Sequence, residues 1–157
     1  MASLLKPKAG SVASMLAMLF GVDDLEVGDG DASLPSSAIG ASYVDDEGAL
    51  VAMLVADYSF AAFSGAALSM IPKGGAEDMA KDEDLSEGVR ANFYEVANIC
   101  SRLLMNDQST HIKLAELVEG AALADAVGTL EGSAVIGFTV PIPRYGNGKL
   151  YFVVSQR

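Results

Sequence analysis

The strongest constraint on the fold is the segment 49–57, which reads Ala-Leu-Val-Ala-Met-Leu-Val-Ala before it reaches Asp57. Side chains along a strand alternate between the two faces of a sheet, so a strand that is apolar at successive positions is buried on both faces. The segment 38–44 precedes it, and the polar run Asp45-Asp46-Glu47-Gly48 between them is typical of a hairpin turn. We therefore predict a hairpin of strands 38–44 and 49–57 whose second strand lies at the centre of a sheet.

Three segments have the apolar spacing that helices need in order to pack on such a sheet. The first, 11–20, is followed by Gly21, a residue that favours a helix end. The second, 59–70, ends before Pro72, which cannot continue a helix. The third and longest, 85–105, has apolar residues every three or four positions, which places them on one face of a helix. These residues are Leu85, Val89, Phe93, Val96, Cys100, Leu103 and Leu104.

Between these segments the sequence is rich in turn-forming and acidic residues. We interpret 28–37, with its Gly, Asp, Ser and Pro residues, and the acidic connector 77–84 as loops. Asp84 and Ser86 are both candidates for the N-cap of the longest helix. Residues 121–130 are compatible with a short helix or with a loop that contains a strand.

The remaining segments complete a single α+β domain over residues 1–157. The further predicted strands are 112–118, 133–141 and 149–155, the last two joined by a turn at Tyr145-Gly146-Asn147-Gly148. The order of elements is then α, β, β, α, α, β, β, β, in which hairpins dominate. Such an order predicts long helices packed on a mainly antiparallel sheet.

Charge and cysteine content limit the partners and the compartment. The formal net charge is −11, which argues against binding to nucleic acid or to an anionic membrane surface. Because Cys100 is the one cysteine, no internal disulfide can form, and we expect a cytoplasmic protein. The one histidine, His111, has no cysteine cluster to support a metal site. No apolar run approaches the roughly 20 residues of a membrane span, so no membrane insertion is expected, and 12–20 is read as a packed helix rather than a signal peptide.

The longest predicted helix also carries polar residues on the side away from its apolar stripe. Glu95 and Asn98 are three residues apart, so their side chains point in a similar direction. Ala91 and Arg102 fall on the same side of the helix. This side is either a binding site or an ordinary solvated helix face.

Over most of its length the sequence resembles the CheX/CheC family of chemotaxis phosphatases, and CheX more than CheC. The resemblance includes the N-terminal helix ending in Leu-Phe-Gly-Val, the hairpin with its apolar second strand, the helix 59–70, the acidic connector and the C-terminal Leu-Tyr-Phe-Val-Val. In that family a helix carries a Glu-x-x-Asn pair, which Glu95 and Asn98 match. CheC typically has two such helices and CheX has one, as this chain does.

The resemblance implies a phosphatase that stimulates dephosphorylation of a phospho-aspartyl CheY-type response regulator, the receiver. It implies that Asn98 orients the attacking water and that Glu95 docks the receiver through the receiver's invariant lysine. An acyl phosphate is already activated, so a carboxamide that positions water supplies much of the missing catalysis. The chain would need no cofactor of its own, because the receiver would carry the Mg²⁺.

The resemblance to CheX also implies a two-fold homodimer. In addition, we expect the apolar C-terminal strand, which contains residues 150–154, to leave a sheet edge that must be covered or paired. A second copy of the chain would cover such an edge.

Three departures from the family pattern favour an alternative function. Ala91 stands where the family has Asp or Ser, and Arg102 stands four residues after Asn98, where a small residue is usual. The third departure is that the family's proline downstream of the pair is missing, because no proline lies between Pro72 and Pro141. The alternative is a non-catalytic CheX-like module that binds a receiver or another signalling or flagellar-switch protein, and an unrelated α+β protein is a further possibility. Burial of Glu95 or Asn98 in the core would exclude both receiver hypotheses.

Overall fold

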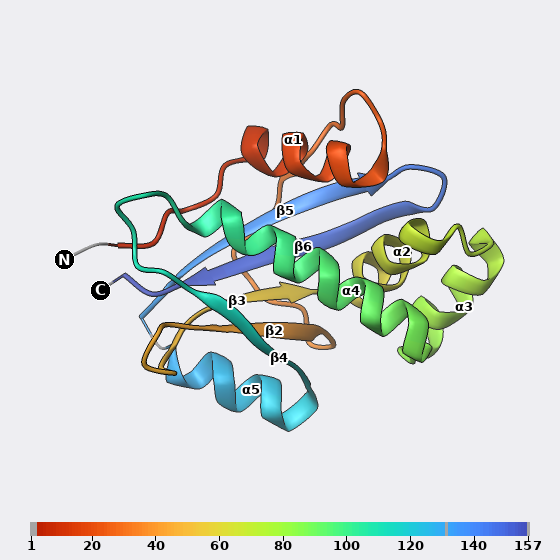
Figure 1. Cartoon of the computed structure of the whole chain (residues 1–157). Coiled ribbons are helices and arrows are strands. Elements are labelled where there is room, and N and C mark those ends of the chain that lie inside the picture. Colours follow the sequence, from red (N-terminus) through yellow and green to blue (C-terminus); the bar gives the residue numbers. More distant parts are fainter. Residues whose placement is uncertain (1–2, 131, 157) are drawn as a thin grey trace.

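A six-stranded sheet forms the centre of the computed structural model, which describes residues 3–130 and 132–156. The strands follow the order β1-β5-β6-β3-β2-β4, and every described pair is antiparallel (Figure 1). Helices pack on this antiparallel sheet, as the α+β prediction stated, and they lie on both of its faces. The strands are β1 (Gly28–Asp29), β2 (Ile39–Val44), β3 (Leu50–Ala56), β4 (Lys113–Glu119), β5 (Ala134–Ile142) and β6 (Gly146–Val154).

The apolar strand β3 lies inside the sheet, as predicted. It pairs with β2 on one side and with β6 on the other. Leu54 belongs to the larger hydrophobic core, whereas its neighbours Met53 and Val55 belong to a smaller core on the opposite face. A strand that is apolar at successive positions can supply both cores at once, which is why this segment sits at the centre.

The larger core lies between the sheet and the helices α1 (Ala9–Phe20), α2 (Tyr58–Ser69) and α4 (Glu87–Cys100). In α4 the side chain of Ser86 accepts a hydrogen bond from the Val89 N–H group, so Ser86, and not Asp84, is the N-cap. The predicted helix 85–105 is in fact α4 followed by a short 3₁₀ helix, η1 (Ser101–Leu104).

Close packing on α2 fixes one side of α4. At Gly65 of α2 an added Cβ atom would lie 2.6 Å from the carbonyl oxygen of Val89, so only glycine allows the two helices to approach this closely. The Asn92 side-chain amide then donates to the Gly65 carbonyl at 2.9 Å and to the Ser69 hydroxyl at 2.7 Å. These contacts set the position of α4 relative to α2.

A buried tyrosine fixes the C-terminal end of α4 to the sheet. At this end the helix tightens, because the Ser101 N–H group donates to the Asn98 carbonyl three residues earlier. The carbonyl of Ala97 instead accepts a hydrogen bond from the Tyr43 hydroxyl of β2 at 2.5 Å. Tyr43 is fully buried, so this bond satisfies two polar groups that have no access to water.

The smaller core lies under α5 (Gly120–Thr129) on the other face of the sheet. From the sequence, 121–130 is compatible with a short helix or with a loop that contains a strand. The structure shows a helix whose buried residue Leu123 faces the sheet. The buried members of this core are Ala38, Met53, Val55, Leu123, Leu130, Tyr151 and Val153.

Two segments predicted as loops contain regular structure. Most of the acidic connector 77–84 belongs to α3 (Lys73–Asp82), an exposed helix whose one buried residue is Ala76. The apolar side of α3 consists of Ala76, Met79 and Ala80 alone, and this stripe is too short to mark a helix in an acidic segment. In 28–37, residues 28 and 29 form β1, which pairs with β5.

The C-terminal hairpin corrects two further predictions. Gly146 already belongs to β6, so the turn lies earlier, at Arg144 and its neighbours, where Arg144 has a positive φ of 76°. The strand β6 was expected to leave a sheet edge, but it pairs with β5 and β3 on its two sides. Its apolar side chains are therefore covered within one chain, and the edge strands of the described sheet are β1 and β4.

Candidate functional site

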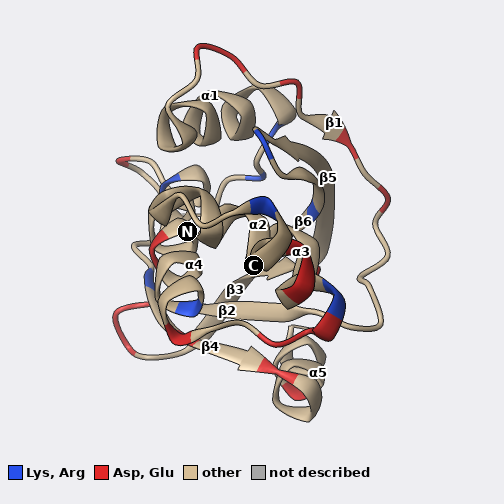
Figure 2. Cartoon of the chain, turned by 90° about the vertical axis from the view of Figure 1, so that its right-hand side faces the viewer, with Lys and Arg blue, Asp and Glu red and all other residues tan. Residues whose placement is uncertain are grey.

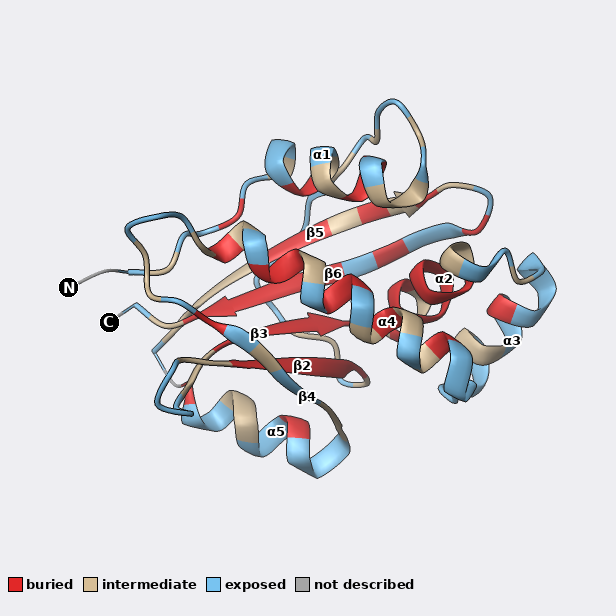
Figure 3. Ribbon diagram, in the orientation of Figure 1, coloured by how far each residue is buried: buried red, intermediate tan, exposed pale blue. Residues whose placement is uncertain are grey.

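One side of α4 faces solvent and carries the polar pair found in the sequence. Glu95 and Asn98 are both exposed, as are Ala91 before them and Arg102 after them. The opposite side of the helix is fully buried at Phe93 and at the neighbouring core positions (Figure 3). Both polar side chains are thus on the surface, which is the geometry that a binding face on this helix requires.

A groove between α4 and the edge strand β4 borders this exposed side of α4. We name it the α4–β4 groove; its lining residues are Glu87, Arg90, Ala91, Tyr94 and Glu95 of α4 and Ala115, Glu116 and Leu117 of β4. Asn98 lies three residues beyond Glu95, just under one helical turn, and is outside the groove lining. A partner seated in the groove would therefore meet Glu95 at the groove wall and Asn98 at the adjoining part of the helix.

Three carboxylates and one guanidinium line the α4–β4 groove. The carboxylates belong to Glu87, Glu95 and Glu116, and the guanidinium belongs to Arg90. Arg90 is already engaged, because its Nη1 lies 2.5 Å from Oε1 of Glu119 at the end of β4. The groove consequently has an excess of negative charge. Further acidic residues lie on α3, β4 and α5 (Figure 2).

Glu119 holds a three-residue network together. Its Oε1 accepts from Arg90, and its Oε2 accepts from the hydroxyl of Tyr58 at the start of α2. Partial burial opposes ionisation of Glu119, but the Tyr58 hydrogen bond and the Arg90 guanidinium outweigh it and hold the pKa of this carboxyl below its ordinary value. Burial, together with the adjacent Glu119, raises the pKa of the Tyr58 hydroxyl.

The residues of this network were missed from the sequence. Tyr58 and Glu119 are 61 positions apart, and Arg90 and Glu119 are 29 positions apart. No local spacing links them, so only the register of β4 beside α4 brings them together.

The side chains of the polar pair are available to a partner. Within the described part of the chain, the side chains of Glu95, Asn98 and Arg102 form no hydrogen bond or ion pair, although the backbone carbonyl of Asn98 accepts from the Ser101 hydroxyl. In contrast, Cys100 on the buried side is enclosed, and burial raises the pKa of its thiol to about 12, so it is inert as a nucleophile.

No other feature of the described residues offers a metal centre. They contain no cluster of three or more His, Cys, Asp or Glu side chains that could hold a metal ion. His111 instead lies 2.9 Å from an Asp46 oxygen, and both side chains are largely exposed. None of the helices found in residues 3–130 and 132–156 is long and apolar enough to cross a membrane.

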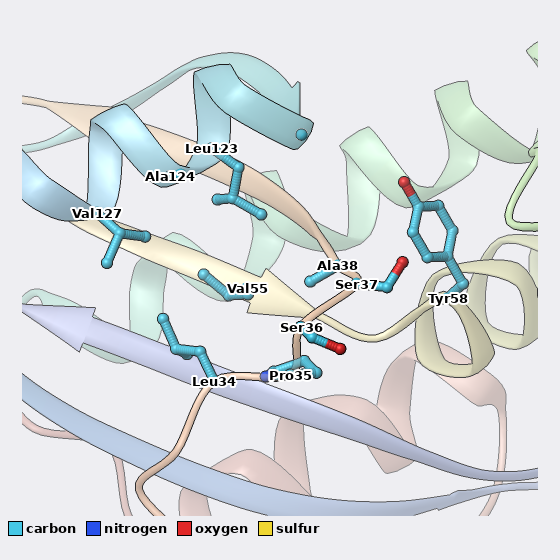
Figure 4. Close-up of a pocket in the computed structure, with 11 residues that line it drawn as sticks. Leu34, Pro35, Ser36, Ser37, Ala38, Val55, Tyr58, Leu123, Ala124 and Val127 are labelled. Carbon is cyan, nitrogen blue, oxygen red and sulfur yellow. The ribbon is translucent and has the colours of Figure 1, made fainter.

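A second cavity, of about 430 Å³, lies beneath α5 (Figure 4). Leu34, Val55, Leu123 and Val127 form its apolar walls, and the hydroxyl of Tyr58 lies at one end with two serines. Its lining contains no carboxylate, carboxamide or cation, in contrast to that of the α4–β4 groove.

Comparisons with known proteins identify the fold. No family model matches the chain, and no curated protein does. Among solved structures, FliM in the FliM–SpeE complex from H. pylori has a TM-score of 0.55 at 12% identity, covering 94% of this chain and 81% of FliM. Thermotoga maritima FliY has a TM-score of 0.54 at 18% identity, covering 94% of this chain and 84% of FliY.

A CheX structure is also among the neighbours. The CheX–CheY–BeF₃–Mg²⁺ complex from Borrelia burgdorferi has a TM-score of 0.45 at 14% identity, covering 91% of this chain and 92% of that one. At these identities the likeness to FliM and FliY establishes the fold alone. The α+β, CheX/CheC-like fold predicted from the sequence is thereby confirmed.

Proposed function

We propose that this chain stimulates the dephosphorylation of a phospho-aspartyl CheY-type receiver that binds to the exposed side of α4. One observation carries the proposal. Glu95 and Asn98, the pair that matches the family motif, are exposed together on that side, at and next to the α4–β4 groove, and in the described part of the chain their side chains form no hydrogen bond or ion pair. A binding face needs unengaged polar groups next to a depression, and this side of the molecule provides both.

In this proposal Asn98 positions the attacking water. Its carboxamide oxygen accepts a hydrogen bond from the water, and its amide donates to the phosphoryl group or to the receiver backbone. The substrate is an acyl phosphate, whose hydrolysis needs correct placement of the nucleophile more than a strong base. The Mg²⁺ that stabilises the phosphoryl charge would be the receiver's own.

Glu95 has the docking role. Its carboxylate lies in the wall of a groove with excess negative charge, which favours a cationic side chain of the partner. The lysine of a receiver active site is such a group. A lysine held by Glu95 would place the phosphoryl group near Asn98, because the two residues are separated by less than one helical turn.

The test is the rate of phosphate loss from phosphorylated receivers of the same organism, with and without this protein. We expect Asn98→Ala to abolish the acceleration while changing the free energy of unfolding little, since the side chain is exposed. Asn147→Ala on β6, another exposed asparagine, is the matched control and should leave the acceleration unchanged. Acceleration by Asn98→Ala equal to that of the parent would refute the mechanism.

A second candidate function is a non-catalytic module that binds a receiver or another signalling or flagellar-switch protein. The exposed Arg102, one turn beyond Asn98, favours it, because a long cationic side chain there can obstruct close approach of a receiver active site. Ala91 favours it as well, since it supplies no polar group at the position where the family has Asp or Ser. This function predicts binding to a receiver without faster phosphate loss.

The two-fold homodimer implied by the resemblance remains a proposal. The C-terminal strand no longer supports the homodimer, because β6 lies inside the sheet and not at its edge. The outer edge of β4 is the longer of the two edges in the described sheet and is the surface on which a second copy could pair.

A further inference from the structure

We propose that Glu119 is a specificity-determining residue of the α4–β4 groove, because it holds the Arg90 guanidinium away from the groove carboxylates and leaves them available to a cationic side chain of the partner. This inference rests on the proposed function only because it takes the partner to be the receiver. The contacts that hold Arg90 away from the groove carboxylates lie within this chain.

The first argument is the position of Arg90. It is the one basic residue in the groove lining, all of which the structure describes, and it is three residues after Glu87 on α4. Side chains three residues apart on a helix are neighbours and form ion pairs when nothing else engages them. An unrestrained Arg90 would therefore pair with Glu87, or extend across the groove to Glu116, and would compete with a cation of the partner.

The second argument is that the carboxylate of Glu119 is fixed from two directions. One oxygen accepts from Arg90 Nη1 at 2.5 Å, and the other accepts from the hydroxyl of Tyr58. Tyr58 is 8% exposed and is held at the start of α2, where Asp57 caps the helix. A carboxylate anchored in this way holds the guanidinium in one place, which a carboxylate on a free side chain would not do.

The third argument is the placement of Glu119 relative to the groove. It stands at the last position of β4, directly before α5, and does not line the groove itself. It can therefore neutralise Arg90 without taking a place that a partner would occupy. Once Arg90 is neutralised, Glu87, Glu95 and Glu116 give the groove its negative charge, which matches a lysine or arginine of the partner.

Three variants separate this role from a merely structural one: Glu119→Gln, Arg90→Gln and the double variant. Gln at position 119 keeps the side-chain length and can still accept from Tyr58, but it carries no charge to hold Arg90. We expect Glu119→Gln to weaken receiver binding by about threefold to tenfold, the range of a modest electrostatic competition. Arg90→Gln should bind at least as well as the parent, and the double variant should recover the affinity of the parent. Equal binding by Glu119→Gln and the parent, or a double variant as weak as Glu119→Gln, would overturn the proposal.

A second readout uses the free protein and needs no receiver. In ¹³C NMR spectra, the carboxyl resonance of Glu87 should shift between the parent and Glu119→Gln, because the released guanidinium pairs with it. The double variant should not show this shift. If the carboxyl resonances of Glu87, Glu95 and Glu116 are the same in Glu119→Gln and the parent, Arg90 is not held away by Glu119, whatever the receiver does.

The two readouts distinguish failure of this inference from failure of the proposed function. If the parent binds no receiver, the proposed function fails, and the carboxyl resonances still decide whether Glu119 holds Arg90 away from the groove. Should Glu119→Gln not fold, as judged by its amide spectrum, Glu119→Asp is the replacement variant. Asp retains the charge on a side chain one methylene shorter, so it should hold Arg90 less well and give the same changes in a weaker form.

Discussion

At the scale of single residues, the exposed side of α4 combines the family pair with an unusual neighbour. Glu95 and Asn98 provide the groups that a receiver phosphatase of this kind would use, whereas Arg102 adds a cation one turn beyond Asn98. In the described part of the chain no carboxylate forms an ion pair with Arg102, whose side chain is exposed in η1, directly after α4. The identity of this one side chain therefore bears directly on the choice between the two candidate functions.

The prediction at this scale concerns Arg102→Ala. If the chain is a phosphatase, we expect this variant to accelerate phosphate loss from the receiver about twofold to fivefold more than the parent, because the obstruction next to Asn98 is removed. Lys81→Ala on α3, another exposed cation, controls for the change in net charge. If Arg102→Ala instead lowers receiver binding and neither protein accelerates phosphate loss, Arg102 is a contact residue of a non-catalytic module.

At the scale of secondary-structure elements, the position of α4 depends on close contacts with its neighbours. Gly65 of α2 allows the backbone of α4 to approach, Asn92 bonds the two helices, and Tyr43 joins the end of α4 to β2. Each contact lies away from the exposed side. The proposed binding face is thus carried on a helix that the core holds in place.

The prediction at this scale concerns Gly65→Ala. The added Cβ would lie 2.6 Å from the Val89 carbonyl oxygen and 2.8 Å from Val89 Cγ1, so the two helices must separate. We expect the free energy of unfolding to fall by about 1–3 kcal/mol, as for other overpacked cores, measured by urea denaturation. Gly128→Ala, in the exposed part of α5 where an added Cβ meets nothing within 4 Å, should not destabilise the protein. A Gly65→Ala protein as stable as the parent would show that α2 and α4 can separate at little cost.

At the scale of the whole molecule, one sheet is shared by two cores of unequal size. The larger core takes α1, α2 and α4, and the smaller takes α5 and the loop before β2. Because β6 pairs on both sides, the most apolar part of the C-terminal hairpin is enclosed. Two weakly acidic groups of the larger core, the thiol of Cys100 and the hydroxyl of Tyr43, are fully buried and are neutral in the folded state.

The prediction at this scale is a loss of stability at alkaline pH. Burial raises the pKa of Cys100 from 9.0 to about 12, and burial also raises that of Tyr43. Their contribution is complete below the pKa of the unfolded state and is lost as pH rises towards that of the folded state, because the unfolded chain ionises first. The free energy of unfolding should therefore fall between about pH 9 and pH 12, and Cys100→Ala should reduce that slope. If the slope is the same in Cys100→Ala, the thiol is not protected by the fold.

The sequence by itself determined the local features of this protein. The continuous apolar run of β3 predicted a central strand, the stripe of α4 predicted its buried and exposed sides, and Ser86 was among the expected caps. Each of these follows from the 2-residue or 3.6-residue repeat of side chains along one segment, together with local hydrogen bonding. The exposure of Glu95 and Asn98 could be predicted for the same reason.

Only the tertiary structure decided which segments lie side by side. It placed β6 inside the sheet, where strand pairing depends on contacts that no single segment encodes. It gave the acidic connector a helix, α3, although little of that helix is buried. Above all, it brought Tyr58, Arg90 and Glu119 together from three elements, because the packing of β4 beside α4 aligns residues that are far apart in the chain. The polar pair lies on one helix and could be found from its sequence, whereas the charge of the α4–β4 groove depends on residues that only folding brings together.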